Sequence, residues 1–465
     1  MAFTISDVLA RGMCVGCGAC AVRTDGKVSV TLGRYRTYEA SLAEDLTAAE
    51  LDAASRVCPI SDDGPDEDEL AATRFGDLER HSRVGHWLGA FAGRITDDDR
   101  VVDSSSGGLT TWFLARLLRG GDVDGVIHVG RNADSGAAFE FVVSRSVEEL
   151  ELRRKSMYTS VSLQSGLDEI RGAGGRYAIV GVPCFIKAAR RLALESPELH
   201  DQLRYFVGIV CGHLKSQFFG ESLAWQAGVA PDQLESVDFR VKNPSRPAGD
   251  YDFQATAKDG TVHTLRTRKA IDGNWGYGAF QPEACNFCDD IFAETADIVF
   301  GDAWLPEYTT DWRGTNVVVV RDAALLAMFD SGVEAGEIAT EALGPDRAAD
   351  SQGGNFRHRR DGLQVRLADD IRRGLPVPKK RLAPSTRHVT RQRLALIRQR
   401  RLMSALSLRA FAEAREADDL DVYREALRPE IATYRSIEHP PSLAKRWDRL
   451  RQRARAIVRR VVNGT

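Results

Sequence analysis

The cysteines near the N-terminus have the spacing of metal ligands. Three thiols recur in Cys14-Val-Gly-Cys17-Gly-Ala-Cys20, with small residues between them. Such a segment can wrap one face of an iron-sulfur cubane, because glycine permits tight turns and leaves backbone amides free to bond sulfide. A fourth iron then needs a remote thiolate, and Cys58, which precedes Pro59, is predicted to supply it. A zinc site is the less favoured alternative, because zinc usually takes its cysteines in two pairs.

The other four cysteines are spread along the main body of the chain. Cys285 and Cys288 form a Cys-x-x-Cys pair ahead of an apolar run that predicts a buried strand. This pair alone is ambiguous, because zinc ribbons, redox disulfides and iron-sulfur sites all use it. Cys184 and Cys211 each follow a predicted strand, at the edge where open α/β sheets bind ligands. Each by itself is more often a small buried hydrophobe, but together the four supply the thiolates of a second cubane.

A glycine-rich turn is a candidate binding element. Residues 104–108, Ser-Ser-Ser-Gly-Gly, lead into an amphipathic helix whose apolar face carries Leu109, Trp112, Phe113 and Leu117. Bare amides at the start of a helix can bind an anion or a flavin carbonyl. Taken alone, the turn is better explained as a serine cap with a glycine turn.

The composition indicates a large globular protein. With 465 residues and 43% apolar content, the chain can bury a sizeable core and is expected to form two domains with appendages. The formal net charge is -3, but the charge is unevenly distributed along the chain. Residues 62–69 are nearly all acidic, and residues 385–465 are basic. The acidic stretch is expected to be a solvated linker, with a docking face for a basic partner as the less favoured alternative.

The sequence predicts a cytoplasmic location. No positively charged leader followed by an apolar segment opens it, and no apolar run is long enough to span a bilayer. In a reducing compartment, eight cysteines favour metal ligation over a disulfide framework.

The C-terminal segment has a distinct charge pattern. Residues 379–410 contain no acidic residue, and residues 443–461 place an apolar stripe around Trp447 and Ile457 on an arginine-rich helix. Such a helix can lie on an anionic membrane surface, which would put the protein at the inner face of the membrane. Docking onto the body or onto an acidic partner is an equal alternative. Nucleic acid is not expected as a partner, because no recognition motif accompanies the charge.

The elements that must position these residues alternate between strand and helix. Strands are predicted at 89–95, 123–130, 176–182, 205–210, 296–300 and 314–320. Helices follow several of these strands, and the residues after 239 alternate like a β-hairpin arm. We therefore predict an α/β fold with α+β elements and a mixed sheet as its core.

Five motifs occur in one order along the chain. They are Ser-Gly-Gly at 106–108, Gly-x-Pro-Cys at 181–184, the strand-end Cys211, the Cys-x-x-Cys pair, and Ala-Asp-Ile-x-x-Gly-Asp-x-Trp at 296–304. In this set the sequence resembles the family of the coenzyme F-420 hydrogenase/dehydrogenase beta subunit, over residues 10–330. Members of that family are iron-sulfur flavoproteins that bind FAD and pass electrons between the flavin and 4Fe-4S clusters. The separated N-terminal cysteines resemble the two-cluster branch that includes 7-hydroxymethyl chlorophyll a reductase.

The resemblance implies two 4Fe-4S clusters and one FAD. The implied cluster ligands are Cys14, Cys17, Cys20 and Cys58 in a first set, and Cys184, Cys211, Cys285 and Cys288 in a second set beside the flavin ring. The implied flavin contacts are Ser105, Ser106, Gly107, Gly108, Lys155, Met157, Tyr158, Gly181 and Pro183. No catalytic residue is assigned, because a structural role is favoured for both His213 and Asp302.

The function implied by the resemblance is coenzyme F-420-linked oxidoreduction. One alternative is a ferredoxin-dependent reductase of an organic substrate, and another is a non-catalytic electron-transfer subunit of a larger redox complex. The expected units are an N-terminal ferredoxin-like iron-sulfur module at 1–75, a domain with flavin contacts at 85–175, a domain with the second cluster and FAD at 176–345, a linker at 346–384, and a basic helical tail at 385–465.

Overall fold

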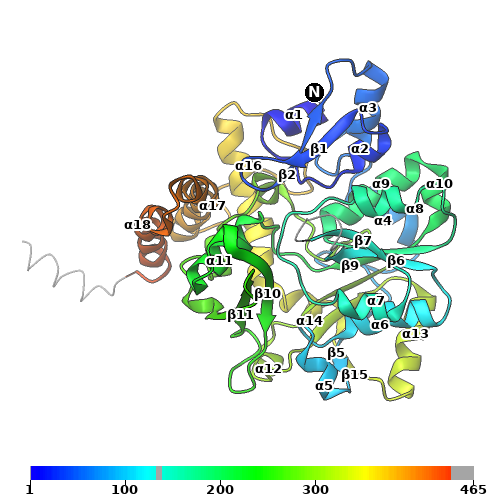
Figure 1. Ribbon diagram of the computed structural model, residues 1–465. Helices are drawn as coiled ribbons and strands as arrows, with labels where there is room; N and C mark the ends of the chain where they lie inside the picture. Colours follow the sequence, from blue (N-terminus) through cyan, green and yellow to red (C-terminus); the bar gives the residue numbers. More distant parts are fainter. Residues whose placement is uncertain (1, 132–138, 441–465) are drawn as a thin grey trace, which may run out of the picture.

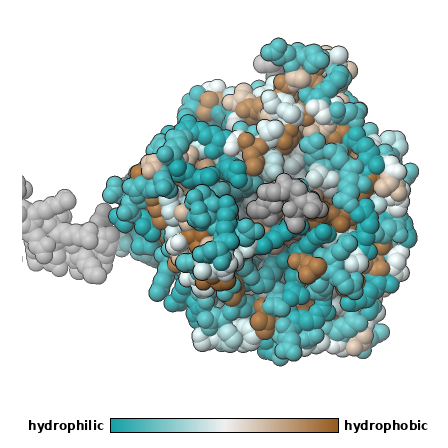
Figure 2. Space-filling view, viewed as in Figure 1, coloured by the Kyte–Doolittle hydropathy of each residue, from teal (hydrophilic) through white to brown (hydrophobic). Residues whose placement is uncertain are grey.

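The computed structural model describes residues 2–131 and 139–440 (Figure 1). The apolar stripe expected at 443–461 lies outside the described residues. Within the described ranges, no helix is both long enough and apolar enough to cross a membrane. The face shown in Figure 2 is mostly hydrophilic, with hydrophobic residues in small separate patches.

A mixed sheet of eight strands forms the centre of the described structure. Across the sheet the order is β15 (Ile338–Ala342), β5 (Gly89–Ile95), β14 (Asn316–Val320), β13 (Ile298–Asp302), β9 (Leu203–Ile209), β8 (Tyr177–Gly181), β6 (Gly125–Gly130) and β7 (Glu140–Ser144). The neighbours β13, β9, β8 and β6 run parallel, whereas the other neighbouring pairs are antiparallel. The predicted α/β fold with a mixed sheet is therefore confirmed.

Helices cover both faces of this sheet. The helices α6 (Leu109–Arg119) and α13 (Ala323–Glu334) pack on one face, and α8 (Gln164–Ile170) and α9 (Pro183–Glu195) pack on the other. Because both faces are buried, the central strands are continuous apolar runs, as in the fully buried β14. Shorter helices complete the layers: α5 (Asp98–Val102), α7 (Val147–Leu152), α10 (Pro197–Gln202), α12 (Pro306–Thr309) and α14 (Gly344–Asp350).

The N-terminal residues form a small unit against α9. Its elements are α1 (Ile5–Ala10), α2 (Ala19–Arg23), β1 (Val28–Leu32), β2 (Tyr38–Leu42), α3 (Ala48–Val57) and α4 (Glu67–Phe75), followed by the short pair β3 (Arg80–His81) and β4 (Gly85–His86). The helices α2 and α3 both contact α9, which places this unit next to the main sheet.

The acidic stretch 62–69 is not the solvated linker that its charge predicted. Glu67 is 7% exposed and pairs with Lys187 of α9 at 3.1 Å. Asp68 pairs with Arg381 at 3.0 Å. These two ion pairs, which we call the acidic clasp, link α4 to α9 and to Arg381. Cations distant in sequence therefore pair with both carboxylates.

The residues after the main sheet return to cover it. Residues 346–384, expected as a linker, contain α15 (Gly353–Phe356), a π-helical turn (Arg357–Asp361) and α16 (Gly362–Arg372). The expected tail begins with two long antiparallel helices, α17 (Arg391–Ala417) and α18 (Leu420–Glu438). Beside them lie α11 (Phe218–Ala227) and a three-stranded sheet of β10 (Leu234–Val241), β11 (Asp252–Ala257) and β12 (Val262–Arg266).

Candidate functional site

A cavity of about 1360 Å³ lies at the carboxyl edge of the parallel strands. The ends of β6, β8, β9 and β13 line it, and this is the edge where open α/β sheets bind ligands. Its volume exceeds the roughly 300–1,000 Å³ of common small-molecule pockets, which leaves room for a dinucleotide-sized ligand.

The wall of this main cavity carries more positive than negative charge. The cationic residues that line it are Arg153, Arg154, Lys155, Lys215, Arg240, Arg268, Arg357 and Arg435, and the acidic residues are Asp302 and Asp350. Such a wall raises the local concentration of anions and suits a ligand that carries phosphate or carboxylate groups.

The serine-glycine turn is held in place by a half-buried lysine. The ammonium group of Lys242 donates to the carbonyl oxygens of Val101 at 2.6 Å, Ser106 at 2.7 Å and Arg313 at 2.6 Å. A Cβ on Gly107 would lie 2.7 Å from the carbonyl oxygen of Gly93, so a larger residue does not fit there. The turn therefore has a fixed shape set by contacts from three distant segments.

The turn presents the start of α6 to the cavity. Gly108, at φ +80°, is the N-cap residue of α6, and it makes no side-chain cap hydrogen bond. The interpretation of this turn as a simple serine cap is therefore wrong. Gly108, Thr110 and Thr111 line the cavity, so the positive end of the helix dipole faces the space inside.

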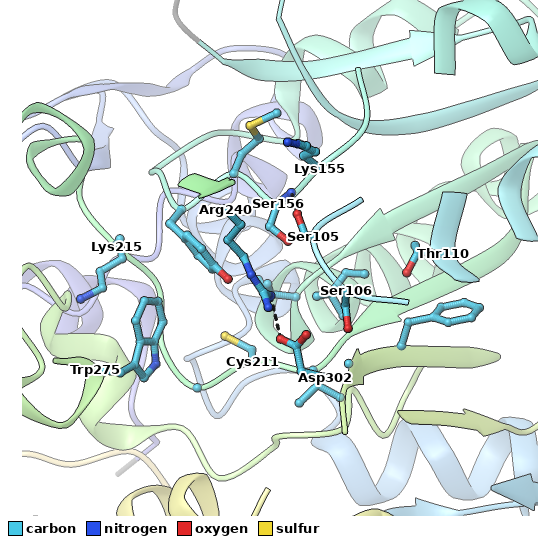
Figure 3. A pocket seen from close by; sticks show the side chains of 18 of the residues that line it. Ser105, Ser106, Thr110, Lys155, Ser156, Cys211, Lys215, Arg240, Trp275 and Asp302 are labelled. Atoms are coloured by element: carbon cyan, nitrogen blue, oxygen red, sulfur yellow. Dashed lines mark hydrogen bonds and ion pairs between the residues drawn. The ribbon is translucent and has the colours of Figure 1, made fainter. Parts of the chain in front are cut away.

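Charged side chains at the end of β10 and just after it point toward the turn. Asp238 pairs with Lys155, Arg240 donates to Asp302 at 2.9 Å, and Lys242 holds the turn. Figure 3 shows the Arg240–Asp302 pair in the middle of the cavity, near Cys211 and Ser106. The sequence analysis did not identify these residues as part of the site. The signal was present, because Asp238, Arg240 and Lys242 alternate along an extended segment, which places them on one side of it.

The predicted loop at 155–158 forms the next part of the wall. Lys155 has φ +84°, a strained conformation for a residue with a side chain, which surrounding contacts must maintain. The amide of Ser156 donates to Ser105 Oγ at 2.8 Å, so the loop and the serine turn are linked. Tyr158 packs edge-on against Phe239 and Trp275.

Most of the predicted flavin contacts come together in this cavity. Ser105, Ser106, Gly108, Lys155, Met157, Tyr158 and Gly181 line it, whereas Gly107 and Pro183 are not among the lining residues. Gly107 instead packs behind the turn, and Pro183 is the first residue of α9.

A second group of side chains forms the opposite end of the cavity. Figure 3 shows Lys215 and Trp275 on the side away from Ser105 and Lys155. The ammonium group of Lys215 lies 4.6 Å from the ring centre of Trp275 and 4.3 Å from that of Phe219. It donates to the carbonyl oxygen of Ala279 at 2.5 Å. His213 stacks on Trp275, with ring centres 4.5 Å apart.

The titration of Lys215 gives a testable pH dependence. Burial lowers the pKa of Lys215 from 10.5 to about 7. Between these values the unfolded chain binds one more proton than the folded chain, so this group makes stability rise with pH. We expect Lys215→Met to remove this contribution. The Tm of the variant minus the Tm of wild type should therefore be highest near about pH 6.5 and fall toward about pH 9. Anaerobic thermal unfolding at both pH values measures it.

The exposed Lys258 provides the matched control for this experiment. Lys258→Met should shift Tm equally at both pH values. A difference in Tm between Lys215→Met and wild type that does not change with pH would contradict the expectation.

The structure brings the first cysteine set together. Cys17 and Cys20 are buried, Cys14 and Cys58 are partly buried, and the four thiols are close enough to interact electrostatically. Burial, and repulsion from Cys58, raise the pKa of Cys14 to about 11. The amides of Gly16 and Ala40 each donate to Cys14 Sγ at 3.4 Å.

The second cysteine set converges at the edge of the main cavity. Cys184, Cys211, Cys285 and Cys288 interact electrostatically with one another, and Cys184 also does so with Cys17. Burial raises the pKa of Cys211 to about 11 and that of Cys285 to about 12. Cys211 also lines the cavity.

The donor chemistry of both sets fits iron-sulfur clusters. All eight cysteines are free thiols, and buried thiols with raised pKa values become thiolates when a metal replaces the proton. Within the described ranges, no three His, Cys, Asp or Glu side chains are arranged to hold a single metal ion. A cubane gives each thiolate its own iron, so it holds four thiolates further apart than one ion does.

Each cysteine set has a buried arginine beside it that the sequence analysis missed. Arg191 of α9 donates to the carbonyl oxygens of Cys58 and Ser61. Arg359 donates to those of Cys211 and Cys288. These guanidinium groups close the loops that carry the cysteines and place positive charge beside them.

The fold is a mixed α/β sheet whose carboxyl edge carries a nucleotide-sized cavity beside a set of thiols. Sequence comparisons give the family. The N-terminal model of the coenzyme F-420 hydrogenase/dehydrogenase beta subunit matches residues 90–168, and the C-terminal model matches residues 174–346. The chain belongs to the family of the coenzyme F-420 hydrogenase/dehydrogenase beta subunit, which confirms the resemblance. Family membership gives the chain a role in redox electron transfer.

Two relatives and one solved structure show how far the likeness extends. The chain is 26% identical over 337 residues to a subunit of the F(420)H(2) dehydrogenase of Methanosarcina mazei. That alignment covers 70% of this chain and 84% of the relative. It is 35% identical over 239 residues to coenzyme F-420-dependent sulfite reductase of Methanocaldococcus jannaschii. That alignment covers 47% of this chain and 33% of the relative. A chain of the F-420-reducing nickel-iron hydrogenase complex of Methanosarcina barkeri aligns with a TM-score of 0.48 and 18% identity, over 67% of this chain and 100% of that chain.

Proposed function

We propose that the protein is an iron-sulfur flavoprotein that passes electrons between FAD and two 4Fe-4S clusters, with coenzyme F-420 as its redox partner. Cys211 carries this proposal, because it belongs to the second cysteine set and also lines the main cavity. A ligand in the cavity can therefore lie against a thiolate of the cluster site. When bound, FAD supplies the exchange between two-electron and single-electron chemistry.

The residues of the chain bind and orient the flavin. The start of α6 and the ammonium of Lys155 present positive charge that suits the pyrophosphate of a dinucleotide. Lys242 keeps the serine turn in its binding shape. The rings of Tyr158 and Trp275 offer flat apolar faces at the other end.

The two cysteine sets act in sequence in this proposal. Cys17 and Cys184 are near enough to interact electrostatically, which supports two neighbouring sets, with the second set at the cavity. Electrons would pass from the cavity through the second cluster to the first, which residues 1–75 would carry as a separate module. This separated set supports a place in the two-cluster branch of the family.

Steady-state turnover tests the choice of redox partner. We expect anaerobically purified protein alone to oxidise reduced coenzyme F-420 when a single-electron acceptor dye is present, followed by the change in deazaflavin absorbance. Turnover that requires reduced ferredoxin and an organic substrate instead would favour the ferredoxin-dependent reductase.

A second candidate is an electron-transfer subunit that works only inside a larger complex. The similarity to the F(420)H(2) dehydrogenase of Methanosarcina mazei favours it, because the relative that matches is named as one of that enzyme's subunits. In this case the isolated chain would bind flavin and iron but would not turn over coenzyme F-420.

A further inference from the structure

A helical segment outside the matched family region holds the loop of the second cysteine set. The helix α15, the π-helical turn and α16 follow one another without a break over residues 353–372, whereas the family match ends at residue 346. From this segment Arg359 Nε donates to the carbonyl oxygen of Cys288 at 2.8 Å, and Arg366 Nε donates to that of Asn286 at 2.6 Å. The Cys-x-x-Cys loop is therefore fixed by arginines that the matched region does not supply.

Arg359 connects this loop to the strand-end cysteine. Its guanidinium group donates to the carbonyl oxygens of Cys211 at 3.3 Å and Asp290 at 3.2 Å, and also to that of Gly212. The side chain is 2% exposed and lies in the π-helical turn, a kind of turn that is frequent at functional sites. One buried side chain thus joins two of the segments that carry the second set.

The positive charge of Arg359 is balanced by the thiols rather than by carboxylates. All of its hydrogen-bond acceptors are backbone carbonyl oxygens, which carry no net charge. The charges that act on it most strongly are those of Cys288, Cys211 and Cys285. A buried charge needs an opposite charge near it, and here the second cysteine set provides that charge.

The two carboxylates that follow Cys288 in the sequence have other partners. Asp289 pairs with Arg381 at 3.1 Å. The carboxylate of Asp290 accepts from the amide of Glu294 at 3.0 Å. Among the described residues, neither of these carboxylates forms an ion pair with Arg359.

The buried arginine at the first cysteine set has a different environment. Arg191 interacts electrostatically with Cys58, but also with the carboxylates of Glu67, Asp66 and Asp62. Its charge is therefore shared between a thiol and the acidic stretch, whereas the charge of Arg359 acts mainly on thiols.

Positive charge beside a cluster site changes how readily the site accepts an electron. Four thiolates around a 4Fe-4S cluster give a net negative charge, which grows by one unit on reduction. A fixed cation nearby stabilises the reduced form more than the oxidised form, and so raises the reduction potential.

We propose that Arg359 is a positioning residue that also raises the reduction potential of the second cluster, by supplying the positive charge that balances its thiolates. The proposal rests on the proposed function, because it takes the second cysteine set to hold a 4Fe-4S cluster. The segment at 353–372 then adapts the family core, since it makes the cluster beside the cavity a better acceptor of electrons.

A redox titration of the anaerobic, full-length holoprotein, followed by electron paramagnetic resonance, tests this proposal. Wild type should show two cluster components. Arg359→Gln should change the oxidised-to-reduced ratio of one component at least about tenfold at a fixed potential, which is a fall of about 59 mV for one electron. The other component should keep its potential. Arg359→Lys, which retains the charge, should stay close to wild type.

Arg360→Gln is the matched control, because it removes the same charge from the next residue of the same turn. Arg360 pairs with Glu294 at 3.2 Å and donates to the carbonyl oxygen of Asp289 at 3.5 Å. Since a carboxylate already balances its charge, this variant should shift the potential much less. An equal shift in Arg360→Gln, or no shift in Arg359→Gln, would overturn the proposal.

Iron content distinguishes the remaining outcomes. Loss of about half of the iron from Arg359→Gln, with full iron in Arg359→Lys, supports a need for the charge at this position. Loss of iron from both variants would show that the hydrogen-bond geometry matters instead of the charge, and would overturn the proposal. Wild type without clusters would overturn the proposed function as well, whereas two clusters with potentials that do not respond to Arg359→Gln would overturn this proposal alone.

Discussion

Wild-type protein purified without oxygen is expected to contain about eight irons and about eight acid-labile sulfides per chain, and Cys285→Ser is expected to lose about half of each. The reason is the separation of the thiols into two sets of four, each with its own loops and its own arginine. Removing one ligand leaves an incomplete site within one set only. Iron and sulfide analysis with electron paramagnetic resonance measures the loss.

The reciprocal variant serves as the control for this prediction. Cys17→Ser should remove the other half of the iron and leave flavin bound, because its set contacts α9 rather than the serine turn. Stoichiometric zinc without sulfide would contradict both expectations. Loss of flavin from Cys17→Ser would contradict the placement of the flavin.

The second large effect is expected at Lys242. Lys242→Met would leave the carbonyl oxygens of Val101, Ser106 and Arg313 without their shared donor. The hydroxyl of Ser104 can donate to either Val101 or Ser106 but not to both at once, and a polar group left unpaired costs about 1–3 kcal/mol, so the turn should lose its binding shape. We expect purified Lys242→Met to hold less than about a tenth of the wild-type flavin, since about 1.4 kcal/mol is already a factor of ten in affinity. Absorbance of the released flavin measures this.

Lys258→Met is the control for this variant, because Lys258 is an exposed lysine at the end of the same three-stranded sheet. It should keep its flavin. Iron content should be near wild type in both variants, which separates loss of flavin from loss of the fold. Stoichiometric flavin in Lys242→Met would show that the serine turn does not depend on this lysine.

The cysteine sets could be anticipated from the sequence because their positions depend on local patterns. Cys14, Cys17 and Cys20 share one short segment, and Cys184 and Cys211 follow apolar runs. Parallel strands bring their carboxyl ends to one edge of a sheet, so a strand-end cysteine can be assigned to that edge before the fold is known.

The charged wall of the cavity could not be anticipated in the same way. The alternation in β10 shows that Phe239 and Arg240 lie on opposite faces, but it does not show what each face meets. In the structure Phe239 packs on Phe219 and Phe253, whereas Arg240 lines the cavity and Lys242 holds the serine turn. That choice depends on packing against α11, a partner that local sequence does not reveal.

The acidic stretch shows the same limit. Its charge predicts solvation, but Lys187 and Arg381, which neutralise it, lie more than a hundred residues further along the chain. Charge density alone cannot identify such partners.

The acidic clasp also determines how the N-terminal unit can move. The clasp lies at an interface whose apolar side chains, from the N-terminal unit and from α9, belong to one buried core, so undocking of the unit would expose apolar surface to water. The distance between the two cysteine sets is then a fixed property of the fold. Under the proposed function, electrons would cross a constant gap, and no swinging carrier domain or conformational gate would limit their passage.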